Sequence, residues 1–180
     1  MRIVFISDIH GVPSTLEAAL ASAESLGYDK IVLLGDLLYH GPRNGVPNFY
    51  DPVAVAKRLN GLKDRIVAVR GNCDAEVDQM MVEFPIMSDY ALLEADGVTF
   101  FLTHGHRWNE RNLPPLGMGT VLAPGHTHIP ELKKLPIIPQ HIEREERHEP
   151  PVGKVFLDGR EDGRGMTGQQ QPKPPKHREH

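Results

Sequence analysis

Five short apolar runs in this chain end in a turn that contains glycine and carries a carboxylate, an amide or an imidazole. In the run of residues 30–36, four apolar residues are followed by Gly35 and Asp36. Two of the four are β-branched, which predicts a strand buried on both faces. Open α/β sheets place their ligand sites at the carboxyl ends of the strands. The repeated pattern therefore predicts an α/β fold in which polar side chains from several strands meet.

The apolar runs also predict the order of the strands. Asp96-Gly97 separates two of them and is a dipeptide typical of a type I′ hairpin turn. The first two strands and the helix between them are expected to form a right-handed, parallel β-α-β unit. The expected strands span residues 2–7, 30–36, 65–70, 90–94, 98–103 and 120–123.

Two helices are expected before the third strand. Ser14 and Glu17 have the spacing of a capping box, which predicts a helix that begins there and ends at Gly27. Asp51 and Pro52 are typical of an N-cap followed by the first helical position. The second helix is expected to end near residues 60–61.

A third helix is expected after the third strand, with Asp74 as its cap. It would continue through Met80 and Met81 and end at Pro85. Methionines at this spacing are typical of core packing, because the flexible side chain fills irregular gaps. We therefore expect this helix to bury its methionines.

The composition excludes several classes of function. The chain has 180 residues, enough for one domain with a core that needs no disulfide. A formal net charge of −4 gives no indication of a nucleic-acid or membrane surface. Cys73 is the single cysteine, which suits a reducing compartment. With no signal peptide or membrane-spanning segment in the sequence, the expected location is the cytoplasm.

Seven side chains with oxygen or nitrogen donor atoms follow the strands. None is a thiolate and Cys73 stands alone, so a zinc finger or an iron–sulfur site is excluded. A histidine or aspartate at one strand end is often only a solvated turn, but five coincidences weaken that alternative. Seven oxygen and nitrogen donors exceed what one tetrahedral ion can use, whereas two ions sharing a carboxylate could take them all. The predicted metal ligands are Asp8, His10, Asp36, Asn72, His104, His126 and His128.

Five motifs in this order resemble those of the calcineurin-like metallophosphoesterases. The resemblance covers residues 1 to about 130 and is strongest to the small bacterial phosphodiesterases of that family. The motifs are Asp8-Ile-His10, Gly35-Asp36 with His40-Gly41, Gly71-Asn-Cys-Asp74, Thr103-His-Gly-His106 and Gly125-His-Thr-His128.

The resemblance implies an α/β/β/α sandwich of two mixed sheets with helices outside. It also implies two divalent metal ions, usually manganese, with Asp36 shared between them. By the family pattern, one ion would be held by Asp8, His10, Asp36 and His128, and the other by Asp36, Asn72, His104 and His126.

The activity implied is that of a metal-dependent phosphodiesterase that cleaves a small phosphodiester by in-line attack of a metal-bridging hydroxide. Asn72 and His104 would act with His40 in catalysis, and Asn72, His40 and Arg43 would contact the phosphate. His40 could instead pack within its loop. Asp74 is expected to orient His104 or another ligand from behind.

Two other functions remain open at this point. Phosphoprotein-phosphatase relatives carry a histidine at the position of Cys73, and that histidine can protonate the leaving group. The absence of that histidine modestly favours a phosphodiesterase over a phosphomonoesterase or nucleotidase. His40 or His106 could serve as a substitute acid. A non-catalytic metal-binding scaffold of the same fold is the second alternative.

The C-terminal third departs from the family pattern. We expect a metallophosphoesterase domain over residues 1–130, an atypical segment over 131–160 and a disordered tail over 161–180, because the tail has almost no apolar residues. The family continues with further strands and an Asn-Pro-Gly-Ser turn, which are not recognisable in this sequence. We hypothesise that this third arose by a frameshift or a replacement, which predicts that C-terminal strands are missing or altered.

Overall fold

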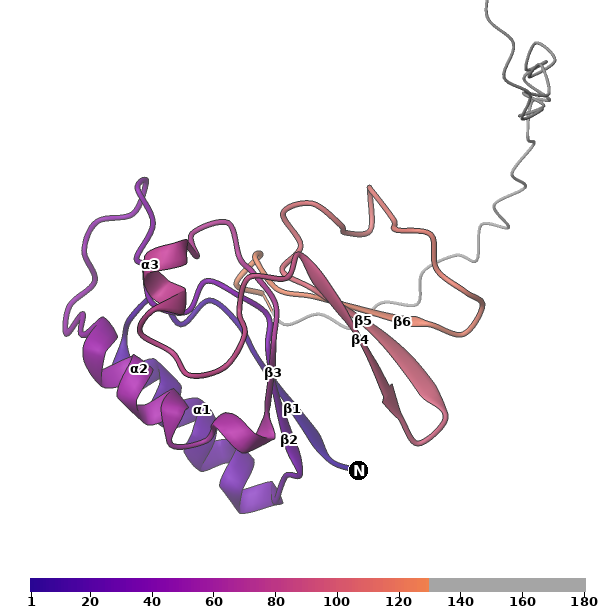
Figure 1. The fold of residues 1–180 in the computed structure, drawn as a ribbon, viewed down its shortest axis with the longest axis horizontal. Helices are drawn as coiled ribbons and strands as arrows, with labels where there is room; N and C mark the ends of the chain where they lie inside the picture. The colour runs from indigo at the N-terminus through magenta and orange to yellow at the C-terminus, as the bar shows by residue number, and fades with distance from the viewer. Residues whose placement is uncertain (130–180) are drawn as a thin grey trace, which may run out of the picture. The chain divides into compact units, whose positions relative to one another are not determined.

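The computed structural model describes residues 1–129, which form two three-stranded sheets and three α-helices (Figure 1). The strands mostly begin and end within two residues of the expected positions, but the first three are shorter than predicted. In chain order the elements are β1 (Ile3–Ile6), α1 (Pro13–Leu26), β2 (Lys30–Leu33), α2 (Pro52–Asn60), the 3-10 helix η1 (Lys63–Arg65), β3 (Ile66–Ala68), α3 (Glu76–Gln79), β4 (Tyr90–Ala95), β5 (Val98–Thr103) and β6 (Val121–Pro124).

The two sheets differ in how their strands pair. The first has the order β1-β2-β3 and is parallel throughout. The second has the order β4-β5-β6, with β4 antiparallel and β6 parallel to β5. The prediction of a two-sheet α/β fold is confirmed, although only the second sheet is mixed within residues 1–129. At the hairpin, Asp96 and Gly97 both have positive φ, as a type I′ turn requires.

Strand β2 lies between two hydrophobic cores, which explains why its residues are apolar on both faces. Ile31 and Leu33 pack with the buried faces of α1 and α2. Val32 and Leu34 face the other way and pack with Leu102 of the second sheet. Alternate residues of a strand point to opposite faces, so one short run serves both cores. The layers of residues 1–129 are therefore helices, first sheet and second sheet.

The predicted starts of the first two helices have different outcomes. Helix α1 begins at Pro13, one residue before Ser14, and Val12 precedes it without a side-chain cap. Proline suits the first helical position because it has no N–H to leave unpaired, so the capping box at Ser14 is not formed. Helix α2 begins as predicted, with an Asp51 carboxylate oxygen accepting from the Ala54 N–H at 2.9 Å.

The prediction of a long third helix is wrong. Helix α3 has four residues, and it is preceded by Ala75 rather than capped by Asp74. Met80 is 86% exposed, so it does not fill the core. Met81 packs against the hydrophobic core between the first sheet and helices α1 and α2. The Asp74 side chain is unavailable as a cap because it binds backbone groups of two other turns.

The predicted C-terminal segment and tail lie outside the described residues. None of the helices in residues 1–129 has the length and the apolar character needed to cross a membrane.

Candidate metal centre

The predicted ligands follow the carboxyl ends of strands in both sheets. Two of the turns that carry them cross with almost no space between their backbones. Gly35 has φ of +91°, and a Cβ atom there would lie 2.4 Å from the Gly71 nitrogen. No residue with a side chain fits this crossing, which brings Asp36 and Asn72 to the same place.

The ligand positions share an unusual backbone conformation. Residues other than glycine seldom adopt positive φ, and each such residue costs about 1–3 kcal/mol of strain. Backbone hydrogen bonds hold the conformation here, from the Asp8 N–H to the Gly35 oxygen at 3.1 Å and from the His10 N–H to the Asp36 oxygen at 3.0 Å. Five of the seven predicted ligands have φ between 49° and 70°, namely Asp8, His10, Asp36, His126 and His128.

Asp36 lies between imidazoles that come from different turns. Its Oδ2 atom is 3.4 Å from His104 Nε2 and 3.7 Å from His10 Nε2, and its Oδ1 atom accepts from the Cys73 N–H at 2.8 Å. Burial raises the pKa of the Asp36 carboxyl, but His104 and the Cys73 N–H outweigh it and lower that pKa to about 2. Asp36 is therefore ionised at neutral pH and faces both sides of the site.

The first group of donors is formed by Asp8, His10 and His128. Asp8 Oδ1 is buried and finds no hydrogen-bond partner within residues 1–129. It lies 3.3 Å from His128 Nε2 and 3.8 Å from His10 Nε2. His10 Nδ1 is 2.8 Å from the Tyr39 carbonyl oxygen, which can only accept, so neutral His10 carries its proton on Nδ1. Its Nε2 lone pair then faces the Asp8 carboxylate, an arrangement that a cation would satisfy.

The second group is centred on His104, which is completely buried. Its Nδ1 atom lies 2.7 Å from the Leu34 carbonyl oxygen, so neutral His104 has a free lone pair on Nε2. That nitrogen faces Asn72 Oδ1 at 2.9 Å and His126 Nδ1 at 3.1 Å.

Without a cation, a proton can take its place at His104. Burial lowers the pKa of this imidazole, but the Asp36 carboxylate more than compensates, so the pKa is raised. The converging atoms are oxygens and nitrogens of the kind that manganese, zinc and similar ions bind. The residues present therefore fit a divalent metal centre.

The groups of side chains that could hold a metal ion share more residues than the family pattern implied. Asp8, Asp36, His104 and His126 offer ligand atoms within 4.8 Å of one another, and so do Asp8, His10 and His128. Asp8 thus reaches both groups, a position that the resemblance assigned to Asp36 alone. Ser7, which the sequence did not indicate, holds Asp8 by donating to its Oδ2 at 2.6 Å. Serine at a strand end is too common to have signalled this role.

The sequence predicted that Asp74 orients His104 or another ligand, and the predicted ligand that it contacts is Asp36. Its carboxylate accepts from the N–H groups of Asp36 at 2.8 Å, Leu37 at 2.9 Å and Gly71 at 2.7 Å. The Nδ1 atom of His104 is already occupied by a backbone carbonyl, so the imidazole needs no carboxylate behind it. Asp74 instead fixes the turn that presents Asp36.

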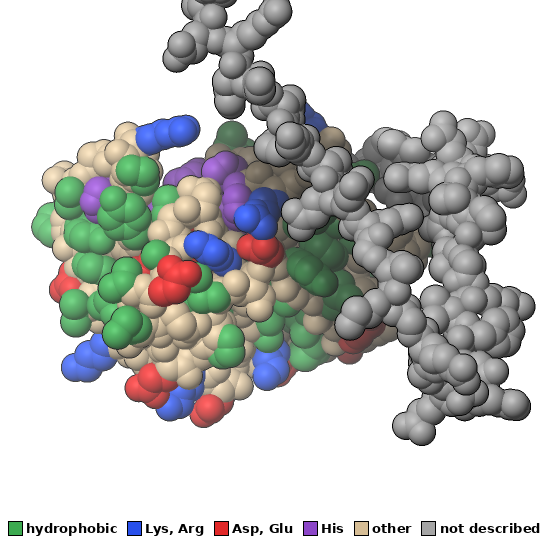
Figure 2. All heavy atoms as spheres, turned by 45° about the horizontal axis from the view of Figure 1, so that its top comes forward, with side chains coloured by type: hydrophobic (Ala, Val, Ile, Leu, Met, Phe, Trp, Pro, Cys, Tyr) green, Lys and Arg blue, Asp and Glu red, His purple; other side chains and the backbone are tan. Residues whose placement is uncertain are grey.

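A cavity of about 480 Å³ opens over these groups, on a face where histidine side chains gather (Figure 2). Arg43 is part of its wall. His40 does not line the cavity. The centre of its ring lies 4.7 Å from that of the Tyr39 ring and 5.3 Å from that of the Tyr50 ring. The lining residues are His10, Asp36, Gly41, Pro42, Arg43, Asn44, Asn72, Cys73, His106, His126 and His128.

The second imidazole of the Thr103-His-Gly-His106 motif is the one that reaches the cavity. Burial and the neighbouring imidazole of His104 lower the pKa of His106. Its Nδ1 atom is buried without a hydrogen-bond partner in the described part of the chain. The sequence had named His106 only as a substitute acid beside His40, and the geometry favours His106 for contact with a bound molecule.

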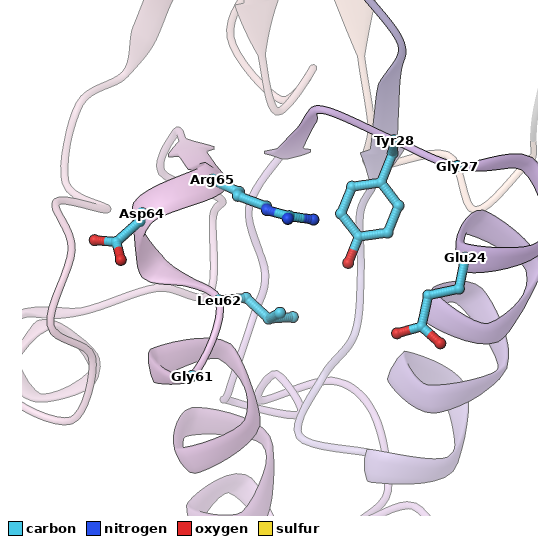
Figure 3. Close-up of a pocket in the computed structure, with 7 residues that line it drawn as sticks. All are labelled: Glu24, Gly27, Tyr28, Gly61, Leu62, Asp64 and Arg65. Carbon is cyan, nitrogen blue, oxygen red and sulfur yellow. The ribbon is translucent and has the colours of Figure 1, made fainter.

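A second cavity of about 500 Å³ lies at the opposite ends of the strands (Figure 3). It is formed where α1 and α2 end and where β2 and β3 begin. Arg65 extends toward the Tyr28 ring, with its guanidinium carbon 5.6 Å from the ring centre, while Asp64 points away. It contains no group of metal-binding side chains among those found in residues 1–129, so it is not part of the candidate site.

Comparison with known proteins decides the family. Residues 1–141 match the family described as the calcineurin-like phosphoesterase superfamily domain. This chain belongs to the calcineurin-like phosphoesterase superfamily. The resemblance seen in the motifs is confirmed.

Curated relatives of this calcineurin-like phosphoesterase include two proteins named as phosphodiesterases. Phosphodiesterase YfcE of Escherichia coli K12 is 46% identical over 130 residues, which is 72% of this chain and 71% of that protein. Phosphodiesterase MJ0936 of Methanocaldococcus jannaschii is 25% identical over 135 residues, which is 71% of this chain and 74% of that protein. A solved structure of the Escherichia coli phosphoesterase YfcE matches with a TM-score of 0.70 at 44% identity, covering 75% of each chain.

Proposed function

We propose that this chain is a phosphodiesterase that depends on two divalent metal ions and cleaves small phosphodiesters. The observation that carries the proposal is the convergence of lone-pair atoms on Asp36, with His10 on one side and His104 on the other. The curated relatives named as phosphodiesterases support the same reaction class.

The metal ligands in this proposal are the seven predicted donors. Asp36 would be shared between the two ions, because its Oδ2 atom faces an imidazole from each group. Manganese is the proposed ion, since oxygen and imidazole donors without a thiolate suit it. In such a site, divalent ions supply charge neutralisation for the phosphoryl group and generate a nucleophile from water at neutral pH.

The chain's own residues would bind and orient the phosphodiester. Arg43 can pair with a phosphoryl oxygen from the cavity wall, because a guanidinium binds such oxygens through charge-assisted hydrogen bonds. Asn72 has an amide group that can donate to the phosphate while its oxygen faces His104. The pKa of His106 is lowered, so its ring is neutral at pH 7. The N–H group of this ring could donate a hydrogen bond to the leaving oxygen.

A small substrate in the cytoplasm is part of the proposal. The cavity of about 480 Å³ has the size of a small-molecule site, and the net charge of −4 argues against a nucleic-acid surface. A single cysteine, held as a thiol, is compatible with a reducing compartment.

Hydrolysis of two chromogenic esters tests the proposal. Full-length protein stripped of metal would be assayed with bis(p-nitrophenyl) phosphate and with p-nitrophenyl phosphate, with and without Mn²⁺. We expect turnover of the diester only with metal. Asp36→Asn should lower it more than about 100-fold, since even residues behind a ligand are worth 10- to 100-fold. Asp64→Asn, at an exposed position away from the site, is the matched control.

Two outcomes would contradict the proposal. Preference for the monoester would point to a phosphomonoesterase or nucleotidase. Bound metal with turnover of neither ester would point to a metal-binding scaffold.

A further inference from the structure

Asn72 is a predicted ligand whose side chain can present two different groups to the metal site. It is exposed, whereas Asp36 and His104 are buried. Its carboxamide has an oxygen on one side and an NH₂ group on the other, and only the oxygen can bind a cation. A half-turn of this group would place the NH₂ group against the metal site. Something must therefore hold the amide in the productive orientation.

His104 cannot do this once a cation is present. In the structure, Asn72 Oδ1 lies 2.9 Å from His104 Nε2. The Nδ1–H of neutral His104 is directed at the Leu34 carbonyl, so Nε2 offers a lone pair. In the metal-free protein, an imidazole that also carries a proton on Nε2 can donate it to Asn72 Oδ1. A cation bound by both atoms takes the place of that proton. The hydrogen bond that orients the oxygen in the metal-free protein is then lost.

Cys73 provides the remaining contact. The Asn72 Nδ2–H donates to Cys73 Sγ at 3.1 Å, on the side of the amide away from His104. The Cys73 backbone N–H donates to Asp36 Oδ1 at 2.8 Å, so the cysteine is itself fixed to the central carboxylate. Gly41 closes over the sulfur, since a Cβ atom there would lie 3.1 Å from it. The sulfur is thus held in place and accepts from Asn72.

We propose that Cys73 is a positioning residue whose sulfur orients the Asn72 amide, so that its oxygen rather than its nitrogen faces the metal site. The residue takes no part in bond making. This role rests on the metal centre proposed above and extends it to a residue outside the seven predicted ligands. It also explains why a weak acceptor suffices, because the hydrogen bond only has to select between two orientations of one side chain.

A cycle of variants at two positions tests the inference by metal binding, without an activity assay. Mn²⁺ alone would be titrated calorimetrically into metal-free full-length protein. Cys73→Ala removes the acceptor and should weaken binding of one of the two ions about 10-fold. Cys73→Ser keeps an acceptor of similar shape and should remain within about 3-fold of wild type. Far-UV circular dichroism and thermal unfolding of each metal-free variant report whether the fold is retained.

Asn72→Asp supplies the decisive background. A carboxylate has two equivalent oxygens, so it needs no orienting partner. Adding Cys73→Ala to Asn72→Asp should therefore change Mn²⁺ affinity by less than about 2-fold. An equal loss in both backgrounds, no loss in Cys73→Ala, or a Cys73→Ser variant as weak as Cys73→Ala would overturn the inference. Wild-type protein that binds no ion would contradict the metal centre itself, and the role of Cys73 with it.

Discussion

The Asp74 carboxylate holds the backbone of Asp36 in place, accepting from its N–H group at 2.8 Å. The same carboxylate accepts from the Gly71 N–H at 2.7 Å. It therefore ties together the two turns that cross at Gly35, and Asp36 owes its position to a residue that touches no metal-binding imidazole. Asp74 is 2% exposed, so water cannot replace it in this role.

Asp74→Asn should destabilise the protein. An amide retains one acceptor oxygen but turns an NH₂ group toward backbone N–H groups, so at least one buried donor loses its partner. We expect a loss of about 2–4 kcal/mol in the free energy of unfolding, measured by urea denaturation without metal. Asp29→Asn is the control, because Asp29 also accepts from a backbone N–H, that of Arg2, but at an exposed position. An effect of Asp74→Asn no larger than that of Asp29→Asn would contradict the role.

The Asp36–His104 pair should give the metal-free protein a stability that depends on pH. The pKa of His104 is raised above its ordinary value of 6.5, so its contribution is complete below that value and is lost as pH rises through the raised pKa. The pKa of Asp36 is lowered from 3.8 to about 2, so its contribution is present above 3.8 and is lost as pH falls toward 2.

The stability of wild-type protein relative to His104→Asn should therefore be greatest between about pH 4 and 6.5. Urea denaturation of both proteins at a series of pH values, with a chelator present, measures the difference. A difference that grows steadily above pH 7 would contradict the assignment of the ion pair.

Cys73 should react slowly with alkylating reagents while the protein is folded. Burial, together with the negative charge of Asp36, raises the pKa of its thiol to about 12. Only the thiolate reacts, so at pH 8 the reactive fraction is far smaller than for an ordinary cysteine with a pKa of about 8.5. Mass spectrometry should show alkylation of metal-free folded protein by iodoacetamide at least about 100-fold slower than in urea. Comparable rates in the two conditions would show that the thiol is not shielded.

Arg43→Ala should raise KM for the diester about 10-fold and change kcat less, because we propose that this side chain in the cavity wall contacts the phosphate. That change corresponds to about 1.4 kcal/mol, near the lower end for a hydrogen bond to a charged group. Arg111→Ala removes an exposed arginine that does not line the cavity and should leave both constants unchanged. Equal effects of the two variants would indicate a general loss of positive charge rather than a specific contact.

The sequence was informative where one residue type has a single structural meaning. The apolar residues of β2 predicted burial on both faces, and Ile31, Val32 and Leu33 are completely buried. Asp51 and Pro52 predicted the start of α2 because their backbone preferences agree. The convergence of the proposed donors was predictable because such residues recur after strands, and parallel strands bring their carboxyl ends together.

The sequence was uninformative where a side chain had several possible partners. Asp74 could cap a helix, orient an imidazole or bind backbone groups, and nothing in the local pattern selects the third. Met80 follows a helical spacing, but α3 ends at Gln79 and leaves the side chain exposed. His40 and His106 each follow a motif residue, and only the packing of the rings shows which one reaches the cavity. These choices depend on contacts between distant parts of the chain.

The most direct test of the two-metal account is a titration of diester hydrolysis with Mn²⁺. Metal-free full-length protein, at a concentration well above the dissociation constants, would receive known molar equivalents of Mn²⁺ before the rate with bis(p-nitrophenyl) phosphate is measured. Because Asp36 faces donors on both sides, the account predicts that the rate reaches its maximum at two equivalents per chain. A maximum at one equivalent, or a rate independent of Mn²⁺, would contradict it.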